Sequence, residues 1–283
     1  MTIQQLLTKS YEELKNVGIE SYIIDCQLLL GKVLNIDRMG ILTNKEMNIS
    51  ESVIRDYLKL IELRKKKMPI KYLLGRCEFM GMNFIVREGV LIPRPDTEIL
   101  VEEVIKVIEK YDYKDICDLC CGSGIIGISV ANYTKETKII SYDISSIACA
   151  VTNENIINFN LSSRVKVKHS DLLSNAIDSG VTFDAIVSNP PYIKELEIET
   201  LMEDVKNYEP HIALNGGIDG LEFYRKISKQ SYRVLNDGGM IAFEIGFNQS
   251  HEVGEILLQS GYKRYYGIKD LSGNDRVIVG FKK

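Results

Sequence analysis

Apolar positions in the first 68 residues repeat at helical spacing. The first helix is expected to begin at a capping box formed by Thr2 and Gln5, with an apolar face made of Ile3, Leu6, Leu7 and Leu14. Leucine and valine residues around 28–34 mark a second helix, and apolar residues spaced three and four apart over 53–61 mark a third. The sequence therefore predicts a small helical domain over residues 1–68.

The pattern changes at Pro69. The run CEFMGMNFIVREGVLI (77–92) alternates between apolar and polar residues and contains Gly81 and Gly89, which predicts a β-hairpin in a linker spanning residues 69–96. The following segment PRPDTE (93–98) interrupts the chain and caps a helix expected from about residue 97 to 110.

Beyond residue 113, short apolar runs alternate with helical runs. The expected strands cover 116–120, 138–143, 165–169, 185–189, 240–245, about 262–268, and 276–281. Helices between most of them imply right-handed βαβ units, and the last two strands lie too close together for a helical crossover. We therefore predict an α/β fold over residues 97–283: a Rossmann-like, seven-stranded, mainly parallel sheet with an antiparallel final strand.

Charge and composition narrow the class of protein. The chain has 283 residues and a net charge of −4, so it lacks the basic footprint of a general nucleic-acid binder. The main exception is the basic run 64–67 (RKKK), which we interpret as the solvated last turn of a helix. No signal peptide or membrane-spanning run is evident, and we expect no membrane association.

The six cysteines show no disulfide-scaffold spacing, which fits a reducing, cytoplasmic location. Cys117 and Cys120 form a C-x-x-C pair, but they fall in an apolar strand run that places them on opposite faces. Because a zinc site needs four convergent ligands, we predict no metal.

A glycine turn follows the first strand of the predicted sheet. In DLCCGSGIIGIS (118–129), Gly122 and Gly124 permit a tight turn and let a ligand approach the amides at a helix start. Asp143 ends the second strand about 20 residues later, the offset at which an acid meets ribose hydroxyls. NAD and S-adenosylmethionine both fit this pattern. Asp118 favours the second, because a carboxylate attracts an ammonium group and repels a pyrophosphate.

The third strand ends at Ser170-Asp171-Leu172. By topology this end lies where an adenine would bind, with Asp171 accepting from the amino group and Leu172 covering the ring. An ordinary Asx turn at Asp171 accounts for the same residues nearly as well.

The fourth strand ends abruptly in VSNPPYI (187–193). Prolines cannot donate hydrogen bonds, so the Asn189 side chain and the carbonyls of Pro190 and Pro191 are presented as acceptors. That set suits a planar NH₂ group, with both N–H donors held by Asn189 and Pro190 and with Tyr192 against its face or the sulfonium. Catalysis would then depend on orientation and electrostatics instead of a strong base.

The motifs DLCCGSG, SYDIS and NPPYI, in this order, resemble class I S-adenosylmethionine-dependent methyltransferases that act on planar amino groups. More narrowly, PIKYLLGRCEFMGMNF, VLIPRPDTE (90–98), NYEPHIALNGGIDGL (207–221) and DLSGNDRVIVG (270–280) resemble the HemK/PrmC family. That family comprises the protein-(glutamine-N5) methyltransferases of peptide-chain release factors. The likeness covers nearly the whole chain and is weakest over the first 65 residues.

The resemblance implies a substrate, the glutamine of the release-factor Gly-Gly-Gln loop, and a helical N-terminal domain that recognises it. It also implies a place over the active site for Arg94, as a substrate contact, and for Thr97. The full set of expected cofactor contacts is Asp118, Cys120, Cys121, Gly122, Ser123, Gly124, Asp143, Asp171, Leu172, Asn189 and Thr97. Two positions depart from the family pattern: Cys120 replaces a usual glycine, and Leu172 replaces a frequent aromatic residue.

Other functions are compatible with parts of this pattern. NPPY also occurs in DNA and ribosomal-RNA amino-methyltransferases, against which the net charge of −4 counts. A nucleotide-binding protein without activity would not need Asn189 and Tyr192. We expect a cytoplasmic monomer with release factors as protein substrates and no stable nucleic-acid partner.

Overall fold

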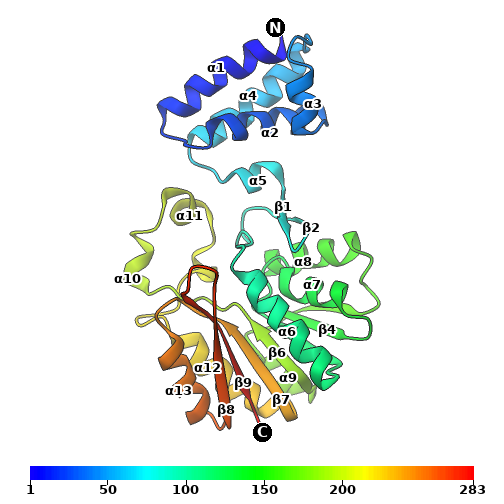
Figure 1. Cartoon of the computed structure of the whole chain (residues 1–283), viewed down its shortest axis with the longest axis vertical. Helices are drawn as coiled ribbons and strands as arrows, with labels where there is room; N and C mark the ends of the chain where they lie inside the picture. Colours follow the sequence, from blue (N-terminus) through cyan, green and yellow to red (C-terminus); the bar gives the residue numbers. More distant parts are fainter. The chain divides into compact units, whose positions relative to one another are not determined.

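A computed structural model describes all 283 residues of the chain, Met1 to Lys283. The chain folds into two compact units. One contains Met1–Arg76 together with Met202–Tyr208, and the other contains Cys77–Leu201 together with Glu209–Lys283. Figure 1 shows the first unit as helical and the second as a sheet flanked by helices.

The helical unit contains the three predicted helices and three short ones that the periodicity did not indicate. Its helices are α1 (Ile3–Asn16), α2 (Tyr22–Leu34), α3 (Arg38–Thr43), α4 (Glu51–Lys65), α5 (Ile70–Leu74) and α11 (Glu203–Tyr208). The capping box is confirmed, since Thr2 Oγ1 accepts from Gln5 N and Gln5 Oε1 accepts from Thr2 N. Helices α1 to α5 share one hydrophobic core, in which the side chains of Leu6, Leu29 and Tyr57 are buried.

The prediction of a solvated basic run was wrong for Arg64. This residue is only 8% exposed, and its Nε donates to Asp25 Oδ2 at 2.8 Å. Asp25 is itself buried, and a buried carboxylate needs a partner. Lys67 is also engaged, because its Nζ donates to the Val17 carbonyl at 2.6 Å. The sequence predicted the end of the helix correctly, but it did not predict that Asp25 lies beside Arg64.

The predicted hairpin is present as β1 (Arg76–Phe79) and β2 (Met82–Ile85). Met80 and Gly81 join the strands with φ values of 50° and 68°, the left-handed pair that a tight hairpin turn requires. Gly89 lies beyond the hairpin, in the loop that precedes α6 (Thr97–Tyr111). Helix α6 begins at the residue predicted.

The seven-stranded sheet has the predicted strands. They are β3 (Asp115–Leu119), β4 (Lys138–Asp143), β5 (Val165–His169), β6 (Phe183–Ser188), β7 (Leu235–Glu244), β8 (Arg264–Lys269) and β9 (Asp275–Phe281), in the order β5-β4-β3-β6-β7-β9-β8. Strands β3 to β7 pair in parallel, whereas β9 is antiparallel to β7 and to β8. The predicted α/β architecture with an antiparallel final strand is confirmed.

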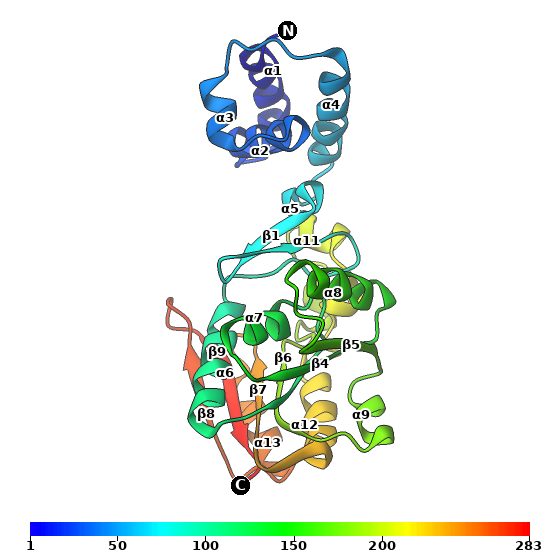
Figure 2. The ribbon, with the colours of Figure 1, turned by 90° about the vertical axis from the view of Figure 1, so that its right-hand side faces the viewer.

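Helices cover both faces of this sheet (Figure 2). Alternate strand residues divide between two cores: Ile116 and Met240 pack with α6, α7 (Ile125–Tyr133) and α8 (Ser146–Asn158). Cys117 and Ile241 pack on the other face, with α9 (Ser174–Ser179), α12 (Glu222–Val234) and α13 (Ser250–Gln259). The chain between β6 and α12 carries α10 (Glu195–Ile198), α11 and the 3₁₀ turn η1 (His211–Ala213).

The strand order reverses between β3 and β6. From β3 the chain proceeds outward through β4 and β5, and it then returns to β6 on the other side of β3. Open α/β sheets bind ligands at such a point, beyond the carboxyl ends of the strands.

Candidate active site

A cavity of about 290 Å³ lies at the carboxyl ends of β3, β4, β5 and β6. Many of the residues singled out from the sequence line it: Cys120, Gly122, Asp143, Asp171, Leu172, Asn189 and Pro191. Its walls are mainly apolar, with a few polar groups converging on it, as is usual for small-molecule sites. The other expected site residues do not line it: Arg94, Thr97, Asp118, Cys121, Ser123, Gly124, Pro190 and Tyr192.

The glycine turn is built from left-handed backbone. Cys120, Gly122 and Gly124 have φ values of 59°, 57° and 81°. A methyl group on Gly124 would approach Thr152 Cγ2 to 2.8 Å, whereas one on Gly122 would meet nothing within 4 Å. Gly124 is therefore required by packing, and Gly122 leaves open space over the turn.

Asp143 is held by backbone amides on two sides. Its Oδ2 accepts from Gly122 N at 2.9 Å, and its Oδ1 accepts from Ser145 N at 2.8 Å. Burial raises the pKa of this carboxyl group, and the amide hydrogen bonds oppose that rise. A carboxylate has about four lone-pair sites, so Asp143 can still accept two hydroxyl donors from a ligand in the cavity.

Asp118 lies deeper than expected. It is fully buried and does not line the cavity; its Oδ2 accepts from Gly127 N at 3.0 Å and from Ser141 Oγ at 3.3 Å. Burial raises its pKa to about 7, and Oδ1 has no hydrogen-bond partner. In this structure Asp118 supports the glycine turn from below. Cys121, Ser123 and Gly124 likewise belong to the turn but not to the cavity wall.

The end of β5 supplies an apolar wall. Asp171 and Leu172 both line the cavity, and Leu172 adopts a left-handed φ of 48° that turns the chain there. Ser170 fixes this turn, since its Oγ donates to the Leu172 carbonyl at 2.8 Å and its amide donates to the Asp143 carbonyl. The loops after β4 and β5 are thereby tied together.

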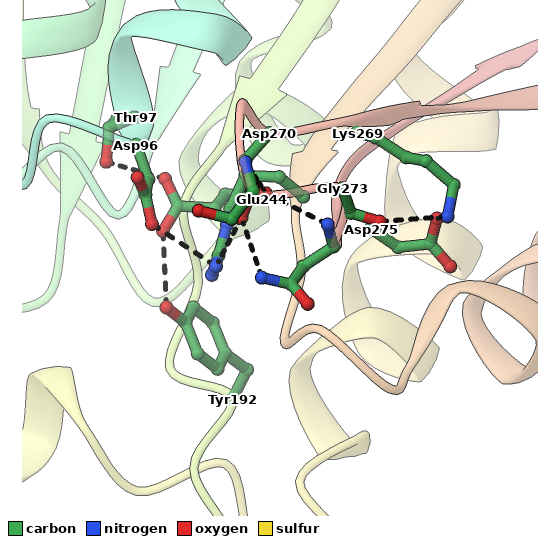
Figure 3. Close-up of polar contacts among 11 residues, drawn as sticks. Asp96, Thr97, Tyr192, Glu244, Lys269, Asp270, Gly273 and Asp275 are labelled. Carbon is green, nitrogen blue, oxygen red and sulfur yellow. Dashed lines mark hydrogen bonds and ion pairs between the residues drawn. The ribbon is translucent and has the colours of Figure 1, made fainter.

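The end of β6 is organised by side chains. Asn189 and Pro191 line the cavity, whereas Pro190 and Tyr192 do not. Asn189 Nδ2 donates to Thr97 Oγ1 at 3.4 Å, and Thr97 Oγ1 donates to Glu244 Oε2 at 2.6 Å. Tyr192 turns its hydroxyl to the other oxygen of the same carboxylate, at 3.2 Å (Figure 3).

Glu244 was not singled out from the sequence. It is the last residue of β7, beside the end of β6, and it is 1% exposed. Burial raises its pKa, opposed by the Thr97 hydrogen bond and the charge of Arg276. The signal that could have identified it is an acid at the carboxyl end of an otherwise apolar strand, next to the strand that ends in NPPY.

Arg94 and Thr97 both take part in polar contacts, with different partners. Arg94 Nη2 pairs with Glu209 Oε1, and Ile92 N donates to Glu209 Oε2 at 3.1 Å. Glu209 is buried, so this pair joins the segment containing IPRPDTE to the one containing NYEPH. Thr97 is buried at the start of α6 and contacts Asn189 directly.

These features together suit a nucleoside-containing ligand and an amide. The Asp143 carboxylate can accept from two neighbouring hydroxyl groups, and the open space at Gly122 lets a ligand approach the backbone. Leu172 offers an apolar surface on which a ring can pack. At the end of β6, the Nδ2 of Asn189 is directed to Thr97, which leaves its Oδ1 as an acceptor. Acceptors of this kind hold N–H donors.

Comparison with known proteins gives consistent matches. Residues 95–211 match the family model "Methyltransferase small domain", and residues 5–75 match "PrmC N-terminal domain". The chain is 58% identical over 282 residues to a release factor glutamine methyltransferase of Clostridium botulinum, covering all of both chains. It is 49% identical to one of Clostridium acetobutylicum, covering 100% of this chain and 99% of that one.

Among solved structures, a methyltransferase from Pyrococcus furiosus superposes with a TM-score of 0.51 at 19% identity, covering 72% of this chain and 90% of that one. This likeness supports the class I methyltransferase fold. None of the helices combines the length and apolar character needed to cross a membrane. The full-length identities and the two matched domains show that the chain belongs to the HemK/PrmC family of release factor glutamine methyltransferases.

Proposed function

We propose that this protein transfers a methyl group from S-adenosylmethionine to the side-chain amide nitrogen, N5, of the glutamine in the Gly-Gly-Gln motif of peptide-chain release factors. The observation that carries this proposal is the acceptor arrangement at the end of β6. Asn189 gives its NH₂ group to Thr97, which leaves its Oδ1 as an acceptor for an incoming amide, and the Pro190 carbonyl would be the second acceptor. The full-length family relationship supports the choice of a release factor.

The cavity residues fit S-adenosylmethionine, which supplies an electrophilic methyl group on a sulfonium. Asp143 would accept from the ribose hydroxyls, and the open space at Gly122 would admit the ligand close to the turn. Asp171 would accept from the adenine amino group, and Leu172 would cover the ring. Cys120, Asn189 and the turn residues Cys121, Ser123 and Gly124 would complete the surroundings. Asp118 would act through the turn that it supports.

The residues at the end of β6 would orient the substrate amide. Asn189 Oδ1 and the Pro190 carbonyl would accept its two N–H groups, and Pro191 forms the cavity wall beside them. An amide nitrogen is a poor nucleophile because its lone pair is delocalised. Fixing both hydrogens aims that lone pair and favours pyramidalisation, so orientation would supply much of the rate enhancement. Tyr192 would close the site from the side of Glu244, and Arg94 would contact the substrate at the rim.

The wider organisation follows from the same proposal. Residues 1–68 would recognise the release factor, residues 69–96 would serve as a hairpin linker, and residues 97–283 would carry the methyltransferase activity. The match of residues 5–75 to the PrmC N-terminal domain supports a distinct recognition role for the helical segment. The protein would act as a cytoplasmic monomer without a stable nucleic-acid partner, consistent with its net charge of −4.

The direct test measures transfer of labelled methyl groups to purified release factor. We expect one methyl group on the Gly-Gly-Gln glutamine by mass spectrometry, and none when that glutamine is replaced by alanine. Equal labelling of the wild-type release factor and of the form with alanine in place of that glutamine would refute the proposal. Labelling of duplex DNA or ribosomal RNA instead would favour the amino-group methyltransferase of nucleic acids that shares NPPY.

A further inference from the structure

A single buried carboxylate holds two hydroxyl groups at the edge of the active site. Glu244 Oε2 accepts from Thr97 Oγ1 at 2.6 Å, and Glu244 Oε1 accepts from Tyr192 Oη at 3.2 Å (Figure 3). These three residues come from the end of β7, the start of α6 and the turn after β6. Thr97 and Glu244 are each 1% exposed, so bulk water does not compete for the hydrogen bond between them.

The donor and acceptor in each hydrogen bond between Asn189, Thr97 and Glu244 follow from the groups involved. An ionised carboxylate can only accept, so the Thr97 hydroxyl must give its one hydrogen to Glu244. The Thr97 oxygen can then only accept from its other neighbour, Asn189, which lies 3.4 Å away. Asn189 must therefore turn its NH₂ toward Thr97. The flipped amide would set two oxygens against each other with no hydrogen between them.

We propose that Glu244 is a positioning residue that sets the orientation of the Asn189 amide through Thr97, so that Asn189 Oδ1 faces the substrate as an acceptor. This inference deepens the proposed function and depends on it, because it concerns how the same site holds the substrate NH₂. If Glu244 did not make the Thr97 oxygen an acceptor, the Asn189 amide could turn its own NH₂ toward the substrate. Two N–H donors would then face each other without an acceptor between them. Glu244 touches neither reactant and acts only through Thr97 and Tyr192.

The charge of Arg276 and the hydrogen bonds from Thr97 and Tyr192 favour the ionised form of Glu244, whereas burial and Asp96 raise its pKa. Arg276 on β9 carries the nearest positive charge, and its Nη2 is shared with Asp96 at 3.2 Å and Asp270 at 3.1 Å. Asp96 and Tyr192 are the other titratable groups that face it, and Asp96 raises its pKa. The Tyr224 hydroxyl donates to the main-chain carbonyl of Glu244, not to the carboxylate.

The raised pKa of Glu244 gives the proposal a pH signature. A carboxyl group whose pKa is raised becomes neutral sooner as the pH falls. Neutral Glu244 can donate a hydrogen as well as accept one, and the fixed polarity toward Thr97 is then lost. We expect kcat of the wild-type protein to fall on the acidic side through the pKa of Glu244, and this acid limb to disappear in Glu244→Gln, whose group does not titrate.

The first test uses a matched pair at Thr97. Thr97→Val keeps the shape but removes the hydroxyl, and we expect kcat for release-factor methylation to fall about 10- to 100-fold, as for a misoriented reacting group. Thr97→Ser restores the hydroxyl and should recover at least about a third of the wild-type kcat, because the same hydrogen bonds can form. Similar kcat values for the valine and serine variants would overturn the proposal.

The second test asks whether Glu244 acts through Thr97. The Tyr192→Phe background removes the other hydroxyl, and Thr97→Val and Glu244→Gln are then combined in a double-mutant cycle. If Glu244 acts through Thr97, adding Glu244→Gln to Thr97→Val should change kcat by less than about two-fold. Fully additive losses would refute the relay.

Two measurements separate positioning from a loss of structure. Calorimetry with S-adenosylhomocysteine and thermal melting should give wild-type values within about two-fold and a few degrees for Thr97→Val, whose loss is confined to kcat. Asp184→Asn is the matched control: Asp184 accepts from Lys114 N and Asp115 N at the opposite end of the sheet, and its replacement should lower the melting temperature but not kcat.

The wild-type protein distinguishes failure of this inference from failure of the proposed function. If wild-type protein methylates no release factor, the proposed function fails and this inference fails with it. If the wild-type protein is active and Glu244→Gln equals it in kcat and in pH profile, only the positioning role of Glu244 is refuted.

Discussion

The two sides of the cavity are built by different means. At the ends of β3 and β4, backbone groups position the site: the amides of Gly122 and Ser145 donate to the Asp143 carboxylate. At the ends of β6 and β7, side chains hold one another, as Asn189 rests on Thr97 and Thr97 on Glu244. A backbone scaffold tolerates changes of side chain that a side-chain relay cannot.

Cys120 illustrates the tolerance of the backbone-built side. It adopts a φ of 59°, in the left-handed region that favours glycine. Its thiol is held neutral, since burial raises its pKa to about 12. No comparable replacement is available to Glu244, because only an acceptor with two oxygens can take both hydroxyl hydrogens. The comparison predicts where substitutions should impair catalysis and where they should impair binding or folding.

The largest effect is expected at Asn189. Asn189→Ala removes the proposed acceptor for the substrate amide, and we expect kcat to fall about 100- to 1,000-fold, as when one preorganised polar group is removed from an active site. Binding of S-adenosylhomocysteine, measured by calorimetry, should change little by comparison. A variant that retained full turnover would contradict the role of Asn189 in orienting the amide.

A smaller effect is expected at Asp143, and it should appear in cofactor affinity and not in kcat. Asp143→Asn removes the charge offered to the ribose hydroxyls, and the loss of a charged hydrogen bond of about 1.5–3 kcal/mol corresponds to roughly 10- to 150-fold weaker cofactor binding. At saturating cofactor, kcat should stay within a few-fold of wild type. If the loss appeared in kcat alone, the division between a binding side and an orienting side would be wrong.

The two glycines of the turn give a matched pair. Gly124→Ala places a methyl group 2.8 Å from Thr152 Cγ2, so we expect about 1–3 kcal/mol of lost folding stability in urea unfolding. Gly122→Ala meets no protein atom within 4 Å, and its methyl group would enter space left for the ligand. Alanine costs about 1–2 kcal/mol at either position, because both have left-handed backbone (φ 57° and 81°). Beyond that shared cost, the effect of Gly122→Ala should be on S-adenosylhomocysteine affinity, and the reverse assignment of the two losses would disprove this interpretation.

The smallest effect is expected for Cys120→Gly. A left-handed conformation costs a non-glycine residue about 1–2 kcal/mol, and glycine in turn loses about 0.5–1 kcal/mol through its flexible unfolded state. We expect a net gain in stability below about 1 kcal/mol by urea unfolding. A clear destabilisation would mean that packing of the thiol outweighs the relief of backbone strain.

The periodicity of apolar residues predicted the sheet well because its signal is local. Every strand was located, although β7 begins at Leu235, five residues before the predicted start, and the helix at Thr97 was located at its first residue. Short helices such as α3 and α5 were missed, since six and five residues are too few to show a periodic face. The location of Asp143 and Asn189 at the cavity followed from topology, because parallel strands bring their carboxyl ends to one edge.

Contacts between distant side chains could not be predicted in the same way. Thr97 and Glu244 are separated by 147 residues, and nothing local marks them as partners. Arg64 appeared solvated for the same reason, because its partner Asp25 lies on another helix. The depth of a side chain cannot be read from a sequence pattern either. Asp118 is the penultimate residue of β3 and Asp143 the last of β4, yet only Asp143 reaches the cavity.

The composition of the helical unit bears on how this protein can be divided. Met202–Tyr208 belongs with Met1–Arg76, and within that unit the Tyr208 hydroxyl donates to the Lys66 carbonyl at 2.6 Å. The polypeptide therefore passes from one unit to the other three times, after Arg76, Leu201 and Tyr208. No single cleavage or truncation separates the units cleanly. A chain shortened to begin at Cys77 would still carry α11, without the Lys66 carbonyl to which its Tyr208 hydroxyl donates.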